Sequence, residues 1–188
     1  MRIITGRYKG AILRTVKGDG VRPTQDRVRE ALFSILGDKV VGAAVLDLYA
    51  GSGGLGLEAL SRGAVSCPFV ERSCPVAAVL QENIDRIGAK NCRVFTAPAD
   101  RALPRLAADG VRFDIVFMDP PYGMNLVPST MQRLGHHKLL NSQGRVVAEH
   151  EFRNALPTEI PPFYRIDTRR YGDTSFTIYT PLLDEEIR

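Results

Sequence analysis

From residue 43 onward, the hydrophobic positions alternate between short continuous runs and longer stretches at helical spacing. The continuous runs are predicted as strands, at residues 43–50, 67–71, 92–97, 113–119 and 144–150. Apolar residues three and four positions apart predict helices over residues 54–62, 75–87, 99–108 and 126–139. Strands that alternate with helices are typical of βαβ units. We therefore expect an α/β fold built on a doubly wound, mostly parallel sheet.

The C-terminal segment has a different pattern, rich in β-branched and aromatic residues. Residues 163–172 and 174–181 are both strand-like, and Gly172 and Asp173 lie at the junction as turn residues. This arrangement predicts a C-terminal antiparallel hairpin added at the edge of the sheet.

The first forty residues precede the βαβ pattern. Residues 2–16 mix β-branched and basic side chains around Gly6 and Gly10, which predicts a small β-hairpin. After a break at GDGVRP, Thr24 is placed to cap a helix that ends near Gly37. An apolar stripe on this helix predicts that one face packs inward, and it consists of Val28, Ala31, Leu32, Ile35 and Leu36.

Composition excludes several classes of protein. The 188 residues are 44% hydrophobic and 24% charged, which suits one globular domain and argues against a disordered or collagen-like chain. No uncharged apolar run approaches the roughly 18 residues of a membrane span, and the first residues lack the apolar core of a secretory signal. The three cysteines form no CxxC pair, and the three histidines show no ligand spacing. We expect a soluble, cytoplasmic protein with reduced thiols and no metal site.

Positive charge is concentrated at the N-terminus. Residues 1–30 hold eight basic and three acidic side chains, net +5, whereas the rest of the chain is net −1. This distribution is typical of an arm that contacts phosphates, although many proteins have a basic end without a polyanion partner. The candidate RNA-binding residues are Arg2, Arg7, Lys9, Arg14, Lys17 and Arg22. If the arm serves only RNA, removing residues 1–17 should weaken RNA binding and spare cofactor affinity.

A glycine-rich turn follows the first predicted strand. The segment runs from Asp47 through Gly51, Ser52 and Gly53 into a helix, and Glu71 ends the next strand twenty residues after Gly51. Glycines let the backbone approach a ligand at a helix N-terminus, and a carboxylate in this place can bond ribose hydroxyls. The motif predicts an adenosine-containing ligand, but it does not by itself separate NAD from S-adenosylmethionine.

A second motif, Asp119-Pro120-Pro121-Tyr122, ends the fourth predicted strand beside the same crevice. Two prolines remove two backbone donors, so this segment offers a carboxylate and bare carbonyl oxygens. Such a site suits an exocyclic amine, whose two N–H groups can bond Asp119 and the Pro120 carbonyl. Tyr122 can stack on the base that carries the amine. Asp119, Pro120 and Tyr122 are therefore the candidate catalytic residues.

Together these residues carry a family resemblance. AGSGGLGLEALSRGA, FVE, the Asp100 segment and DPPY resemble class I S-adenosylmethionine-dependent amino-methyltransferases, which have a Rossmann-like fold. RIITGRYKG, RPTQDRVREALFSIL and RRYGDTSFTIY are similar to the bacterial 16S rRNA guanine-N2 methyltransferase family that modifies guanine 966. The similarity runs from about residue 1 to 180. Arg72 and Ser73, which follow Glu71, depart mildly from the family pattern.

The resemblance implies the cofactor, the substrate and further site residues. It implies S-adenosylmethionine bound by the glycine turn, with Glu71 on the ribose and Asp100 or Arg101 near the adenine. The expected cofactor-binding residues are Thr24, Asp47, Gly51, Ser52, Gly53, Glu71, Asp100, Arg101 and Asp119. The expected partner is 16S rRNA within a small-subunit particle, met by a monomer. Residues 1–40 would form the basic hairpin arm and helix, and residues 41–188 the methyltransferase domain.

Three other functions remain open. A DNA adenine-N6 methyltransferase also uses DPPY, but it usually needs a sizeable target-recognition domain, and no segment here is long enough. An NAD-dependent oxidoreductase would explain the glycines but neither DPPY nor the basic arm. A non-catalytic RNA-binding module would leave the cofactor crevice without a use.

Overall fold

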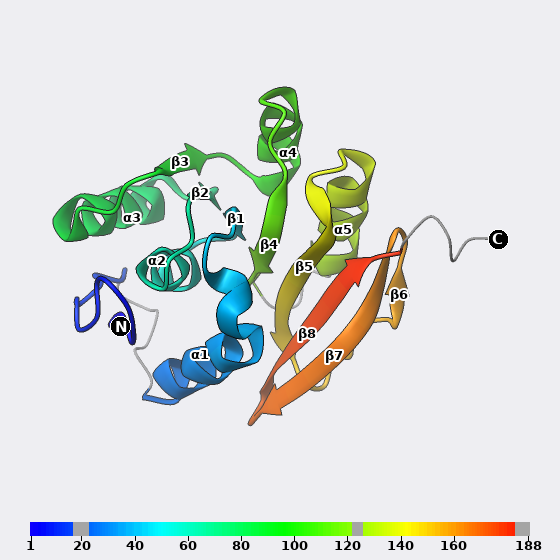
Figure 1. Ribbon diagram of the computed structural model, residues 1–188, viewed down its shortest axis with the longest axis horizontal. Coiled ribbons are helices and arrows are strands. Elements are labelled where there is room, and N and C mark those ends of the chain that lie inside the picture. Colours follow the sequence, from blue (N-terminus) through cyan, green and yellow to red (C-terminus); the bar gives the residue numbers. More distant parts are fainter. Residues whose placement is uncertain (17–22, 122–125, 183–188) are drawn as a thin grey trace.

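One mixed β-sheet runs through the molecule and carries helices on both faces (Figure 1). The computed structural model describes residues 1–16, 23–121 and 126–182. The strands are β1 (Val45–Leu48), β2 (Cys67–Glu71), β3 (Cys92–Thr96), β4 (Phe113–Met118), β5 (Leu140–Glu151), β6 (Glu159–Ile160), β7 (Phe163–Tyr171) and β8 (Thr174–Pro181). The helices are α1 (Pro23–Leu36), the 3-10 helix η1 (Gly37–Val40), α2 (Gly54–Ser61), α3 (Cys74–Ile87), α4 (Ala99–Ala108) and α5 (Leu126–His136).

The strand order sets the position of the ligand crevice. Within the described residues the order is β3-β2-β1-β4-β5-β8-β7-β6, and the strands from β3 to β5 are parallel. The chain moves outward from β1 to β3 and then returns to β4 on the other side of β1. In open α/β sheets, ligands bind at the carboxyl ends of the strands at such a reversal. The predicted doubly wound sheet is therefore confirmed, and its switch point lies between β1 and β4.

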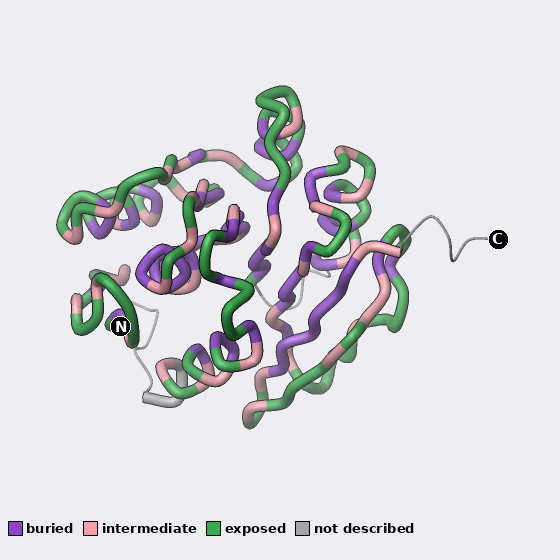
Figure 2. Tube along the Cα trace, viewed as in Figure 1, coloured by how far each residue is buried: buried purple, intermediate pink, exposed green. Residues whose placement is uncertain are grey.

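Two apolar clusters fill the space between the sheet and its helices. One face packs against α1, α2 and α3, with Leu32, Phe33, Leu57 and Leu80 fully or almost fully buried. The other face packs against α4 and α5, with buried side chains that include Leu103, Leu106, Met131 and Leu134. Figure 2 shows buried and exposed residues alternating along α3, α4 and α5, whereas α2 is buried over most of its length. Each βα unit therefore buries the apolar stripe that its spacing predicted.

The predicted elements agree with the structure in kind and differ at their ends. α3 shows how local chemistry sets a boundary: Pro75 lies in its first turn, and Gly88 ends it with a left-handed φ of 66°. β5 begins at Leu140, four residues before the predicted start, and α5 ends at His136. β7 and β8 form the expected antiparallel hairpin, which pairs with β5 through β8. None of the helices in the described ranges is both long enough and apolar enough to cross a bilayer.

The N-terminal arm (residues 1–16) differs from the predicted hairpin. It contains a single antiparallel bridge between Arg2 and Ile12 rather than two strands. A longer ladder does not form because the arm lies against α2, with Ile3 and Leu13 buried in the core. Gly6 has a φ of 88°, and a Cβ there would collide with the Ser61 carbonyl. The arm is therefore held by contacts with the body of the protein, which its local sequence does not reveal.

Candidate active site

The carboxyl end of β1 leads into a tight turn with three residues in the left-handed region. Tyr49, Gly51 and Gly53 have φ values of 63°, 54° and 89°. Nothing lies within 4 Å of the place where a Cβ on Gly51 would stand, so this side of the turn is open. A Cβ on Gly56 would collide with Phe69 and Cys67 on β2. The glycines thus allow the turn and let α2 pack closely on the sheet.

Asp47 is buried inside this turn and holds the first turn of α2. Its Oδ2 accepts a hydrogen bond from the Gly56 N–H at 2.8 Å, and the residue is 2% exposed. Burial raises the pKa of Asp47 to about 7, with the Gly56 hydrogen bond opposing the rise and the charges of Asp119 and Glu71 adding to it. Asp47, Glu71 and Asp119 therefore lie close enough to influence one another.

Glu71, at the end of β2, fixes the outer side of the same turn. Its Oε2 accepts from the Gly51 N–H at 3.0 Å and its Oε1 from the Ser73 N–H at 2.8 Å. An ionised carboxylate has about four acceptor positions, so these two bonds leave room for more. The half-buried carboxylate can receive ribose hydroxyls while its orientation is set by the backbone.

The second motif lies directly across the switch point. β4 pairs with β1 so that Met118 is opposite Leu48, and Asp119 follows at the level of Tyr49. Asp119 is exposed, Pro120 is buried and Pro121 is exposed. The structure thus places Asp119 and Pro120 beside the glycine turn. Tyr122 lies outside the described residues.

Tyr49 is a site residue that the sequence did not indicate. Its hydroxyl hydrogen-bonds to the Thr130 hydroxyl of α5 at 2.7 Å, and burial raises its pKa. A left-handed φ is costly for a bulky side chain, by about 1 to 3 kcal/mol, and such residues cluster at functional sites. The contact fastens the end of β1 to α5 and so helps to fix the switch point.

The remaining predicted cofactor residues lie on three different parts of the fold. Asp100 and Arg101 lie exposed in the first turn of α4, and the charge of Asp100 contributes to the raised pKa of Tyr49. Ser52 is buried beside the glycines. α1 begins at Pro23, one residue before Thr24, so Thr24 is inside the first helical turn rather than its cap.

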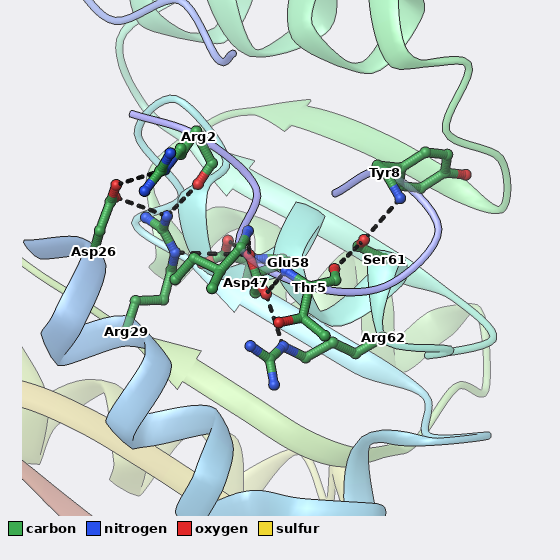
Figure 3. Close-up of polar contacts among 11 residues, drawn as sticks. Arg2, Thr5, Tyr8, Asp26, Arg29, Asp47, Glu58, Ser61 and Arg62 are labelled. Atoms are coloured by element: carbon green, nitrogen blue, oxygen red, sulfur yellow. Dashed lines mark hydrogen bonds and ion pairs between the residues drawn. The ribbon is translucent and has the colours of Figure 1, made fainter. Parts of the chain in front are cut away.

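The arm is held mainly by one buried carboxylate, Glu58 of α2 (Figure 3). Glu58 is 0% exposed and accepts from the backbone N–H groups of Ile4 at 2.7 Å and Thr5 at 3.1 Å. Arg62 donates to it at 2.7 Å, and the Nε of Arg29 lies 3.9 Å away. Glu58 thus joins the arm to α2 and to the buried arginine of α1.

Arg29 and Ser61 complete the docking of the arm. Arg29 donates to the Arg2 carbonyl and pairs with Asp26 at 3.0 Å. The Ser61 hydroxyl accepts from the Tyr8 N–H at 2.9 Å, and its carbonyl accepts from the Arg7 N–H at 2.7 Å. The backbone N–H groups of Ile4, Thr5, Arg7 and Tyr8 are therefore all bonded to α2.

Asn83 of α3 links the far end of the arm to the glycine turn. Its side-chain amide donates to the carbonyls of Arg14 at 2.9 Å and Ser52 at 3.0 Å, and its oxygen accepts from the Arg14 N–H at 2.8 Å. Asn83 is 0% exposed. Through the hydrogen bonds of this buried amide, the arm is connected to the glycine turn.

The candidate RNA-binding side chains differ in their availability. Arg2 pairs with Asp26 at 3.6 Å and Arg14 with Glu82 at 2.8 Å, and both arginine side chains remain largely exposed. Arg7 lies over the Tyr8 ring, and Lys9 is exposed. Lys17 and Arg22 lie outside the described residues.

The sequence motifs do not point to Glu58 and Asn83, but the helical pattern around each of them is informative. Each is a polar residue within an otherwise apolar helical stripe, and buried polar groups need partners. Both side chains hydrogen-bond to the arm, which is distant from them in sequence.

Comparisons with known proteins identify a family and relatives of this chain. The family model described as Conserved hypothetical protein 95 matches residues 1–180. The ribosomal RNA small subunit methyltransferase D of Escherichia coli (strain K12) is 37% identical over 180 residues, which cover 95% of this chain and 89% of that protein. YlbH of Bacillus subtilis is 36% identical over 180 residues, 95% of this chain and 98% of that one.

Solved structures show the same fold. The structure of yhhF from Escherichia coli is 36% identical with a TM-score of 0.83, covering 96% of this chain and 97% of that chain. SMU.776, solved in complex with SAH, is only 15% identical but has a TM-score of 0.66 over 85% of this chain and 50% of that one. The chain therefore has the α/β Rossmann-like class I methyltransferase fold, and it belongs to the Conserved hypothetical protein 95 family, whose model matches it over residues 1–180.

Proposed function

We propose that this chain is an S-adenosylmethionine-dependent rRNA methyltransferase that acts on the exocyclic N2 amine of a guanine in small-subunit rRNA. The observation that carries the proposal is the convergence of three carboxylates on the glycine turn. Asp47, Glu71 and Asp119 come from the ends of three strands, and the last lies beside the donor-free Pro120 and Pro121.

This charge pattern favours S-adenosylmethionine over NAD. In dinucleotide-binding proteins the pyrophosphate takes the N–H groups at the N-terminus of the first helix. Here the Gly56 N–H is already bonded to Asp47, and the negative charges of Glu71 and Asp119 act on the same place. A second anion would be repelled there, whereas the cationic amino and sulfonium groups of S-adenosylmethionine would be attracted.

The residues around the turn can hold each part of this cofactor. Glu71 would accept the ribose hydroxyls, and the Gly51–Gly53 backbone would approach the methionyl part. Asp100 or Arg101 would contact the adenine, and Thr24 would contact the methionyl end. The cofactor supplies a methyl group on a sulfonium centre, which makes it an alkyl donor.

The acceptor amine would be held by Asp119 and Pro120. The lone pair of guanine N2 is delocalised into the ring, so the amine is a poor nucleophile while it stays planar. Hydrogen bonds from its two N–H groups to the Asp119 carboxylate and the Pro120 carbonyl favour a pyramidal nitrogen and the positive charge that develops on it. Tyr122 would stack on the base. As the N2–methyl bond forms, the methyl–sulfur bond of the sulfonium would break to leave a neutral thioether, and the proton lost from N2 would pass to solvent.

Support for an rRNA substrate comes from the relatives and from the basic arm. The Escherichia coli relative is named a small subunit rRNA methyltransferase, and it matches this chain over nearly its full length. Arg7 and Lys9 lie exposed on the arm, where they can contact phosphate. We propose that the monomer acts on 16S rRNA within a small-subunit particle.

The test is nucleoside mass spectrometry of small-subunit rRNA from cells that lack the gene. We expect loss of one N2-methylguanosine per rRNA, restored by the wild-type gene and not by Asp119→Asn. The control is Asp109→Asn, which removes an exposed carboxylate at the end of α4. Unchanged N2-methylguanosine, or a loss of N6-methyladenine from DNA instead, would refute the proposal. Tighter binding of NAD than of S-adenosylmethionine in calorimetry would refute the cofactor.

A further inference from the structure

An exposed arginine–phenylalanine pair lies at the same end of the sheet as Asp119. The guanidinium carbon of Arg170 stands 3.5 Å from the centre of the Phe152 ring, and Phe152 is 43% exposed. The Nε of Arg170 donates to the Gly172 carbonyl at 2.8 Å, which holds the guanidinium in place. We call Phe152 and Arg170 the stacking platform.

Strand register places the stacking platform near the acceptor pocket. β5 runs parallel to β4, with Ala148 opposite Met118, so the level of Asp119 corresponds to Glu149. The paired strand continues for two more residues to Glu151, about 7 Å further, and Phe152 follows directly.

The backbone on both sides of the stacking platform is fixed. Glu151 pairs with Thr174 on β8, and Arg170 of β7 pairs with Ser175 of the same strand. The Phe152 N–H donates to the Asp173 carbonyl at 2.8 Å, which ties the turn after β5 to the tip of the hairpin. The stacking platform is therefore built on the sheet rather than on a free loop.

Its chemistry suits an unpaired nucleobase. RNA-binding proteins stack splayed bases on aromatic rings and on arginine planes, and this interaction tolerates any base. The Phe152 ring carries no charge, so its contribution is stacking, whereas the guanidinium of Arg170 can also attract phosphate; the neighbouring Arg169 pairs with Asp167 at 2.9 Å. A target guanine turned into the pocket beside Asp119 leaves its neighbours unstacked, and one of them needs a new surface.

We propose that Phe152 and Arg170 stack a base that neighbours the target guanine, a role that rests on the function proposed above. The partner is single-stranded RNA beside the modified nucleotide. Because Phe152 contributes stacking and no charge, its loss should weaken RNA binding without changing the salt dependence of binding, unlike the loss of a phosphate contact.

The test compares Phe152→Leu and Arg170→Leu with wild type. The matched control is Arg93→Leu, which removes the same charge and a similar contact, 4.5 Å over Phe95, on β3 at the opposite edge of the parallel strands. Fluorescence anisotropy with a 12-nucleotide single-stranded RNA measures binding at several salt concentrations. We expect Kd to rise about fivefold or more in both platform variants, with Phe152→Leu keeping the wild-type salt slope and Arg93→Leu the wild-type Kd.

Methylation of small-subunit particles by the same proteins separates this proposal from the function. If wild type methylates the particle, platform variants with wild-type Kd for the oligonucleotide overturn the stacking proposal. Weaker methylation of the particle combined with an unchanged oligonucleotide Kd would indicate a protein partner and would also overturn it. If wild type transfers no methyl group, the function is refuted, while a platform-dependent Kd still supports RNA stacking.

Discussion

Replacement of Glu58 by alanine should destabilise the protein far more than the loss of an exposed ion pair. The carboxylate is fully buried and bonds two backbone N–H groups of the arm together with Arg62. Arg29, 5% exposed, stands 3.9 Å away. Alanine would leave these donors without their acceptor in the interior.

The size of the effect follows from the general cost of breaking buried ion pairs. Removing one partner and leaving the other charge buried costs about 3 to 5 kcal/mol. Domains have a total stability of about 5 to 15 kcal/mol. For a chain of this size, each kcal/mol lowers the Tm by about 2 to 4 °C, so we expect a fall of about 6 to 20 °C.

Urea denaturation and thermal melting measure this change, with Glu82→Ala as the control. Glu82 also joins the arm to the body, since its carboxylate lies 2.8 Å from Arg14, but both side chains are more than half exposed. A surface pair of this kind contributes about 0 to 1 kcal/mol. If Glu58→Ala were no less stable than Glu82→Ala, the arm would not depend on its buried anchor.

Three further predictions concern the carboxylates of the crevice. Glu71→Ala should weaken S-adenosylmethionine binding, measured by calorimetry, by about 1.5 to 3 kcal/mol and by more than Asp119→Ala does, because Glu71 loses charge-assisted bonds to ribose; equal losses would contradict its role. Asp119→Asn should lower single-turnover methylation by a few orders of magnitude with an unchanged Tm, because an amide can donate toward the incoming amine; a rate within threefold of wild type would remove Asp119 from the mechanism. The pKa of Asp47 is about 7 in the folded chain against an ordinary value of 3.8, so the folded state holds an extra proton between these values and the free energy of unfolding falls as pH rises from about 4 to 7. Asp47→Asn, whose amide oxygen can still accept from Gly56, should flatten this fall in urea titrations, and identical profiles would show that the buried group does not titrate there.

The parallel half of the sheet could be predicted because each of its strands is an apolar run with clear breaks. A strand buried on both faces needs a nearly continuous hydrophobic sequence, and β1 and β4 have one that is interrupted only by Asp47 and Asp114. The start of β5 was missed because Asn141, Ser142 and Gln143 are polar. These residues lie between Leu140, which pairs with Phe113, and Arg145, which pairs with Ile115, where the register of the ladder shifts.

The candidate site was predictable where its residues are close in sequence or lie at strand ends. Topology brings the turn after β1 and the turn after β4 together, so the sequence alone predicts that Gly51 and Asp119 share one crevice. The hydrogen bond between Tyr49 and Thr130 joins residues 81 positions apart. The left-handed φ of Tyr49 accompanies this contact with α5, and no local sequence pattern predicts it. The family resemblance is confirmed, whereas the role of each site residue stays a prediction.

The arm illustrates the limit of reasoning from charge. Its basic residues predicted a separable RNA-binding segment, so that its deletion would leave cofactor affinity unchanged. The structure contradicts the premise: Ile3 and Leu13 belong to the core.

The link through Asn83 extends the consequence to the glycine turn. Deleting residues 1–17 would remove the Arg14 carbonyl and N–H from Asn83, which also holds the Ser52 carbonyl. The buried amide of Asn83 would lose two of its three hydrogen bonds, and unsatisfied buried polar groups destabilise the fold. The turn would therefore loosen, and cofactor affinity would fall together with RNA affinity. Deletion therefore cannot separate the two functions.

Replacing only exposed side chains, Arg7 and Lys9, by alanine leaves the backbone bonds of the arm intact. If the arm contacts phosphate, this double variant will lower RNA affinity and flatten its salt dependence while calorimetry gives the wild-type affinity for S-adenosylmethionine; an unchanged salt slope would make the arm a structural element alone.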